Sequence, residues 1–135
     1  MPRFLIAEQC RELDITPMDI ILEPAGRNTA AAVACAALYA DSLDLYDDPL
    51  LLILPADHHI ENNSAFVSAV ARSISVASQG LLMTFGIEPT VAHTGYGYLQ
   101  QGAELGGHVF KVDGFIEKPD AAMAQAYLDK GGVME

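Results

Sequence analysis

The chain has 135 residues, 51% of them hydrophobic, which suits one domain with a core of its own. Its formal net charge of -11 makes the surface repel polyanions, so a long nucleic-acid groove is excluded. No apolar run reaches the roughly 18 to 20 residues of a membrane span. Cys10 and Cys35 lack metal-ligand spacing and no signal-like core follows Met1, so we expect a cytoplasmic protein.

The first part of the chain predicts two helices around a short strand. The apolar spacing from Pro2 to Leu13 is typical of a short amphipathic helix, and Ile20 to Leu22 is a short aliphatic segment. After a loop, Asn28 or Thr29 can cap a helix that runs through the alanines to about residue 39.

The stretch PLLLILPADHHI organises the middle of the chain. Leu50 to Leu54 is continuously aliphatic, which favours a strand covered on both faces, as in a parallel sheet. Pro55 ends this run, and Asp57, His58 and His59 follow it. Ligands collect at the carboxyl ends of parallel strands, so Asp57 is placed to bind a metal or a metal-bound phosphate. The alternative is that Asp57 caps the next helix.

The remaining segments continue the alternation of helix and strand. In order, they are a helix from Phe66 to Ser78 capped by Asn63 or Ser64, a strand from Leu81 to Phe85, the glycine-rich loop or strand edge HTGYGYLQQG, a strand from Val109 to Ile116, and a helix from Asp120 to Lys130. This alternation predicts an α/β fold.

Four polar clusters follow these strands or lie beside them: Glu23 to Thr29, Asp57 to His59, Thr94 to Tyr98, and Glu117 with Lys118. If the strands are parallel, three of the clusters lie on the same rim of the sheet. Each cluster taken alone has a plain structural explanation, such as an exposed carboxylate, a turn glycine or a surface lysine.

As an ordered set, the segments EPAGRNTAAA, LPADHHI, TFGIEPT, TGYGYL and FIEKPD resemble the nucleotidyltransferases that make nucleotide sugars, and within them the bacterial mannose-1-phosphate guanylyltransferases. The resemblance runs from about Phe4 to Gly132. It implies a three-layer Rossmann-like fold, with a mostly parallel sheet and helices on both faces, incomplete at both ends. Residues 1–135 would form a partial nucleotide- and sugar-binding domain without an isomerase domain. The implied reaction transfers GMP from GTP to mannose 1-phosphate and gives GDP-mannose and pyrophosphate.

The resemblance also assigns a nucleotide-binding segment. Its residues are Glu23, Gly26, Arg27, Asn28 and Thr29. Guanine presents two donors on one edge, and a single carboxylate can accept from both, which favours Glu23 as the guanine ligand. Gly26 would let main-chain groups approach the base.

The sugar phosphate is assigned to Tyr96, Gly97, Glu117 and Lys118. Glu117 would hold mannose hydroxyls, and Lys118 would neutralise the phosphate. Asp57 matches the metal-binding aspartate, and a hard carboxylate suits Mg²⁺. Asp57 and Lys118 are therefore the expected catalytic residues, with His58 and His59 in structural roles.

One family feature is not found in this sequence: the glycine-rich loop of the form GGxGxRLxPLSR that cradles the triphosphate. We therefore expect little or no turnover from this polypeptide alone. We also expect a bare sheet edge that associates with a copy of itself, giving a homo-oligomer. Two other functions stay open, a non-catalytic nucleotide-binding or oligomerising remnant and a metal-dependent phosphoesterase of the DHH type.

Overall fold

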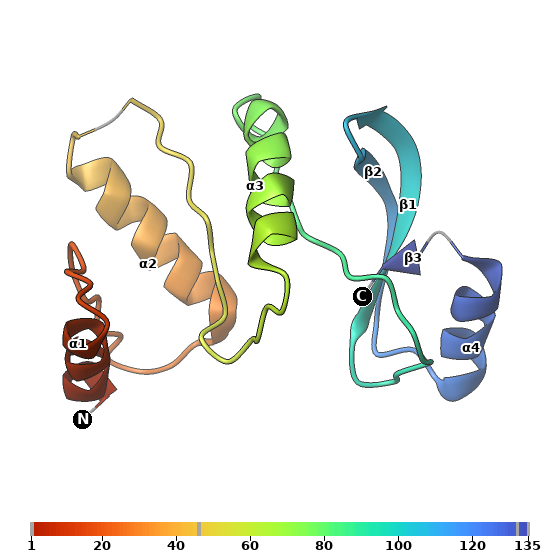
Figure 1. Ribbon diagram of the computed structural model, residues 1–135, viewed down its shortest axis with the longest axis horizontal. Helices are drawn as coiled ribbons and strands as arrows, with labels where there is room; N and C mark the ends of the chain where they lie inside the picture. Colours follow the sequence, from red (N-terminus) through yellow and green to blue (C-terminus); the bar gives the residue numbers. More distant parts are fainter. Residues whose placement is uncertain (1, 46, 132, 135) are drawn as a thin grey trace. The chain divides into compact units, whose positions relative to one another are not determined.

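The computed structural model describes residues 2–45, 47–131 and 133–134, which form four helices and three strands (Figure 1). The chain divides into two compact units, Met1–Ala56 and Asp57–Glu135, and each is described by itself. Among the described helices, none combines the length and the apolar composition that crossing a membrane requires.

The first unit contains the two predicted helices, α1 (Pro2–Glu12) and α2 (Asn28–Ser42). The predicted side-chain cap of α2 is wrong, because Arg27 occupies the N-cap position and forms no side-chain cap hydrogen bond. Asn28 is already the first helical residue, with φ of 65°, so neither it nor Thr29 precedes the helix as a cap must.

Three segments predicted as strands, Ile20–Leu22, Leu50–Leu54 and Leu81–Phe85, pair with no neighbour in the described residues. In the central segment, Leu50 is 48% exposed and Leu54 is 55% exposed, so the expected burial on both faces is not met. A strand forms only where a second strand accepts its backbone hydrogen bonds. Aliphatic sequence alone therefore gives an extended segment here.

The second unit begins with α3 (Asn63–Ala77). Its cap lies one residue before the expected Asn63 or Ser64, since the side-chain oxygen of Asn62 accepts the Ala65 N–H at 3.0 Å. The helix ends at Ala77, and Gly80 follows with φ of 82°, a conformation that glycine adopts without strain.

The sheet of the second unit is antiparallel, with the order β2-β1-β3. Strand β2 (Val109–Glu117) confirms the predicted strand, and the glycine-rich segment becomes the ten-residue strand β1 (Gly97–Gly106). The short β3 (Val133–Met134) pairs with β1. The expected parallel sheet is therefore not seen in the described residues.

Helix α4 (Ala121–Lys130) covers one face of this sheet and confirms the last predicted helix. Tyr98 of β1, Ala124 of α4 and Val133 of β3 are buried together and form the core. The Tyr98 hydroxyl donates to the His93 carbonyl at 2.9 Å, so the buried phenol is hydrogen-bonded as burial requires.

Side chains alternate along a strand, so the neighbours of Tyr98 point to the opposite face of the sheet. The pairs Gly97–Glu117 and Leu99–Phe115 lie on that face. Phe115 is 60% exposed and Glu117 is also exposed, which leaves this end of the hairpin open.

Candidate active site

The end of the β1–β2 hairpin brings together four of the predicted site residues. Gly97 and Glu117 are paired across the antiparallel ladder, and the Lys118 N–H donates to the Tyr96 carbonyl at 3.1 Å. The clusters TGYGYL and FIEKPD therefore meet because β1 begins where β2 ends. Parallel strands would have placed three of the four clusters on one rim, but the strands that carry these two clusters are antiparallel.

The charged side chains at this end are available to a ligand. Lys118 Nζ lies 3.8 Å from Glu117 Oε1, and these side chains are 64% and 60% exposed. An exposed ion pair of this kind contributes only about 0 to 1 kcal/mol to stability, so either group can exchange it for a contact with a ligand. A carboxylate and an ammonium group beside each other suit a ligand with hydroxyls and a phosphate.

Lys118 has a left-handed backbone, with φ of 47°. This conformation costs an L-residue roughly 1 to 2 kcal/mol, and such strain gathers at functional sites. The buried Pro119 follows, and its ring fixes the path of the chain out of the strand. The backbone of Lys118 is thus held by the strand before it and the proline after it.

Gly97 packs closely against β2. A Cβ at this position would lie 2.7 Å from both Cε2 and Cζ of Phe115 and 3.0 Å from Oε2 of Glu117. Any larger residue would have to displace these groups. The sequence reasoning did not single out Phe115, although strand alternation places it two residues before Glu117 on the same face.

The predicted nucleotide-binding residues form one exposed segment at the start of α2. Glu23 to Arg27 lead into the helix, with Asn28 and Thr29 in its first turn. A Cβ on Gly26 would meet nothing within 4 Å, so its main chain is open to approach. The first-turn N–H groups lack a side-chain cap, and such groups attract anions.

Asp57 lies in an exposed turn after the extended segment 50–54, and its side chain forms no hydrogen bond or ion pair with other described residues. Within the described ranges, no three His, Cys, Asp or Glu side chains gather as a metal cluster. One carboxylate with waters and substrate phosphates is an ordinary Mg²⁺ environment, so Asp57 fits that ion. Glu23 to Thr29 and the hairpin belong to different units, and their convergence stays a prediction.

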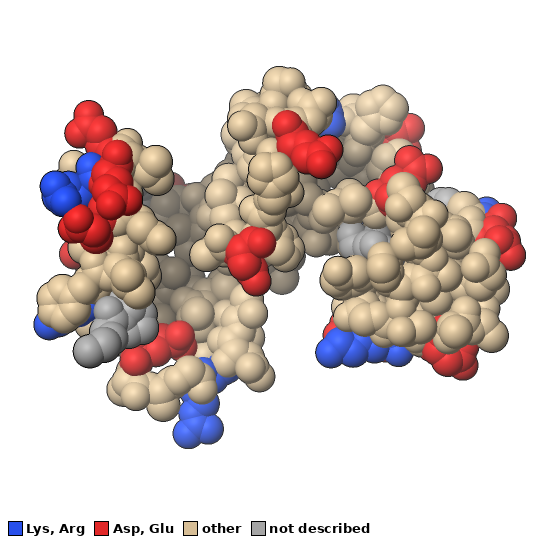
Figure 2. All heavy atoms as spheres, turned by 60° about the horizontal axis from the view of Figure 1, so that its bottom comes forward, with Lys and Arg blue, Asp and Glu red and all other residues tan. Residues whose placement is uncertain are grey.

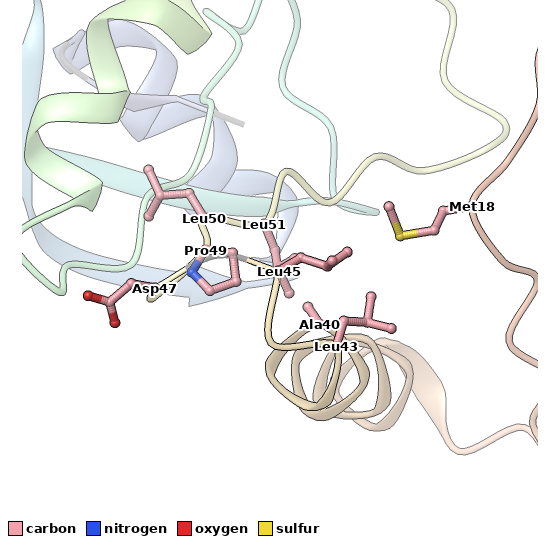
Figure 3. Close-up of a pocket in the computed structure, with 8 residues that line it drawn as sticks. All are labelled: Met18, Ala40, Leu43, Leu45, Asp47, Pro49, Leu50 and Leu51. Atoms are coloured by element: carbon pink, nitrogen blue, oxygen red, sulfur yellow. The ribbon is translucent and has the colours of Figure 1, made fainter.

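A shallow apolar hollow of about 510 Å³ lies elsewhere in the first unit, between α2 and the 43–51 segment (Figure 3). Its lining residues are Met18, Ala40, Leu43, Leu45, Asp47, Pro49, Leu50 and Leu51. None of the predicted site residues lines it. Its walls include two side chains of the unpaired aliphatic segment, Leu50 and Leu51.

Acidic residues outnumber basic ones in this chain, 18 Asp and Glu against 7 Lys and Arg. Figure 2 shows Asp and Glu side chains at several places on the visible face, and Lys and Arg side chains at several others. A local cation such as Lys118 can still bind one phosphate on an acidic surface.

The sequence of this chain matches one known protein family over nearly its whole length. Residues 1–133 match the model of the Nucleotidyl transferase family. The chain belongs to this family. Because the match spans both units, the nucleotidyl transferase assignment covers the segment at α2, Asp57 and the hairpin end alike.

Relatives of this nucleotidyl transferase chain include the xanthan biosynthesis protein XanB of Xanthomonas campestris pv. campestris strain B100, 51% identical, and the mannose-1-phosphate guanylyltransferase RfbM of Salmonella typhimurium strain LT2, 50% identical. Each alignment covers 96% of this chain and 27% of the relative. A crystal structure of mannose-1-phosphate geranyltransferase from Thermus thermophilus matches with a TM-score of 0.77 and 34% identity, over 92% of this chain and 37% of that one. The chain thus spans about 27% of the length of the curated relatives it matches.

Proposed function

We propose that this chain is the nucleotide- and sugar-binding part of a mannose-1-phosphate guanylyltransferase. The reaction transfers GMP from GTP to mannose 1-phosphate and releases pyrophosphate. Relatives at about half identity carry that name, and the chain spans 27% of their length. We propose that this polypeptide binds the substrates and catalyses the reaction weakly or not at all.

The observation that carries the proposal is the meeting of Gly97 and Glu117 across the hairpin, with Lys118 held beside Tyr96. Glu117 accepts hydrogen bonds from sugar hydroxyls, and Lys118 pairs with the phosphate. A phosphorylated hexose presents both kinds of group a short distance apart. The 3.8 Å separation of Glu117 Oε1 and Lys118 Nζ suits such a ligand.

In the proposed reaction, an oxygen of the sugar phosphate attacks the α-phosphorus of GTP in line. The bond from that phosphorus to the bridging oxygen breaks, and pyrophosphate leaves with the electron pair. Lys118 orients the attacking phosphate and reduces its repulsion from the triphosphate. Asp57 would hold Mg²⁺, which neutralises phosphate charge when it is bound. The guanine base would bind Glu23 and the open main chain at Gly26, with Arg27, Asn28 and Thr29 beside it.

We extend the proposal to the architecture of the complete domain. Segments 20–22, 50–54 and 81–85 would join a mostly parallel sheet with helices on both faces, in a three-layer arrangement. Their half-exposed aliphatic side chains and unpaired backbone support this. For the same reason we propose that the isolated chain self-associates, and that it acts in the cytoplasm.

Isothermal titration calorimetry with mannose 1-phosphate, GTP and GDP-mannose, in the presence of Mg²⁺, tests the proposal. We expect Lys118→Ala to weaken mannose 1-phosphate about tenfold or more, because a charge-assisted hydrogen bond is lost, and to change GTP far less. Lys111→Ala is the matched control, since Lys111 is an exposed lysine of β2, the strand that ends just before Lys118, and lies outside the predicted site. Equal losses for both ligands would defeat the assignment.

The same assay separates the alternatives. Absence of heat with all ligands would favour the non-catalytic remnant. Hydrolysis of a phosphodiester with Mn²⁺ and no sugar phosphate would favour the phosphoesterase. That alternative has little support, because two-metal chemistry needs several ligands and the described residues gather no three of them.

A further inference from the structure

The space in front of the Gly97 Cα is already filled by protein. The ring of Phe115 occupies it, with Cε2 and Cζ 2.7 Å from the position of an added Cβ, and Oε2 of Glu117 is 3.0 Å from the same point. Both side chains come from β2 and lie on the same face of the sheet. The absence of a side chain at residue 97 therefore serves this contact inside the protein.

We infer that Phe115 is a positioning residue, which acts on the sugar site through Glu117. The ring packs into the notch that Gly97 leaves and limits where the neighbouring carboxylate can lie. Lys118 Nζ limits it from another direction, 3.8 Å from Oε1. This inference rests on the proposed function, in which Glu117 holds the sugar hydroxyls.

The exposure of Phe115 supports this role. The ring is 60% exposed, and it lies on the face opposite the buried Tyr98, so it takes no part in the core. Its cross-strand partner in the register is Leu99, on the same face of the sheet. Phe115 thus packs against Gly97 at the end of the hairpin that carries Glu117.

The inference changes the reason for glycine at position 97. If Gly97 only lets the sugar approach the main chain, an added methyl group blocks the sugar itself, whatever residue stands at 115. If Gly97 makes room for Phe115, the methyl group displaces the ring and the carboxylate first. Replacing Phe115 by alanine then opens the space that the methyl group added at position 97 needs. The two explanations therefore predict different behaviour of the double variant.

The test compares wild type, Gly97→Ala, Phe115→Ala and the double variant by titration with mannose 1-phosphate and by thermal melting. We expect Gly97→Ala to weaken binding about tenfold and to lower the melting temperature, because the notch is overfilled. Phe115→Ala should weaken binding by a smaller factor. The double variant should bind and melt like Phe115→Ala alone, so the effects are not additive. The control Gly114→Ala should match wild type, since its Cβ would lie no closer than 3.6 Å to Gln100.

Each outcome has one meaning. Binding losses that multiply in the double variant, with wild-type binding intact, would overturn this inference and leave the proposed function standing. A melting temperature unchanged by Gly97→Ala would overturn the packing on which the inference depends. Wild-type protein that binds no mannose 1-phosphate would overturn the proposed function, and the role of Phe115 with it.

Discussion

Replacing Lys118 by glycine should leave the protein more stable than replacing it by alanine, although both changes remove a proposed substrate-binding group. Lys118 has φ of 47°, a left-handed conformation in which the Cβ of an L-residue crowds the following carbonyl. Glycine has no Cβ and adopts this conformation freely. The backbone hydrogen bond from the Lys118 N–H to the Tyr96 carbonyl, 3.1 Å long, is kept in the variant.

The size of the effect follows from two opposing terms. Relief of the left-handed backbone is worth roughly 1 to 2 kcal/mol. Glycine lowers the free energy of unfolding by about 0.5 to 1 kcal/mol, because it has more conformational freedom in the unfolded chain. Lys118→Ala keeps the strain and loses the same exposed ion pair with Glu117, so it isolates the backbone term. We expect Lys118→Gly to exceed Lys118→Ala in free energy of unfolding by about 0.5 to 1 kcal/mol.

Chemical denaturation followed by circular dichroism measures this difference, and titration with mannose 1-phosphate measures the function. Both variants should lose binding to the same extent, because each lacks the ammonium group. Lys111→Ala again serves as the control for loss of one positive charge on β2. A glycine variant no more stable than the alanine variant would show that the left-handed backbone carries no strain, and the reasoning would fail.

Three further predictions concern stability. Asn62→Ala should lower the free energy of unfolding by about 1 kcal/mol, because the Ala65 N–H loses its cap, whereas Asn62→Asp should retain it; equal denaturation curves would contradict this. Ala124→Leu should cost about 1 to 3 kcal/mol, since residue 124 is fully buried, and a wild-type melting temperature would argue against the observed core. The hydrogen bond to Asp19, and then partial desolvation and the carboxylate charge, raise the pKa of Tyr39 above its ordinary 10.0. A raised pKa means that the contact stabilises the protein below about pH 10 and is lost as pH rises through the folded value. Asp19→Asn should therefore lower the alkaline midpoint of Tyr39 ionisation in ultraviolet absorbance, with Tyr39→Phe as the reference, and an unchanged midpoint would contradict the contact.

The helices were predictable because their signals are local. The segments around α1, α2, α3 and α4 carry apolar spacing, alanine content or a capping residue directly before the helix. The aliphatic segments could not be predicted in the same way, because a strand depends on a neighbouring strand as much as on its own residues. Leu50 to Leu54 has strand-like composition, yet it has no ladder among the described residues.

The roles of the site residues stay a prediction, and the structure arranges the hairpin residues differently from the expected arrangement. The resemblance assigned TGYGYL and FIEKPD to one sugar-phosphate site, and the structure pairs Gly97 with Glu117 across the hairpin. The expected cause, a shared rim of parallel strands, did not apply, because the second strand returns antiparallel through a turn at Gly106 to His108 with positive φ angles. Phe115 was overlooked because its importance lies in a cross-strand contact with a glycine, which no single segment reveals.

The two halves of the proposed site differ in the structure that supports them. The hairpin end is fixed by a register between residues about twenty apart in sequence, and by α4 packed on Tyr98 and Val133. The nucleotide segment is an exposed loop at the start of α2, in the other unit, and it borders aliphatic chain without a sheet partner. The hairpin end has support from its own strands and helix, whereas the nucleotide segment would depend on the larger sheet that we propose. The isolated chain should therefore hold mannose 1-phosphate better, relative to the complete enzyme, than it holds GTP. The reverse order of losses in parallel titrations would mean that the triphosphate site, and not the hairpin, is the self-contained part.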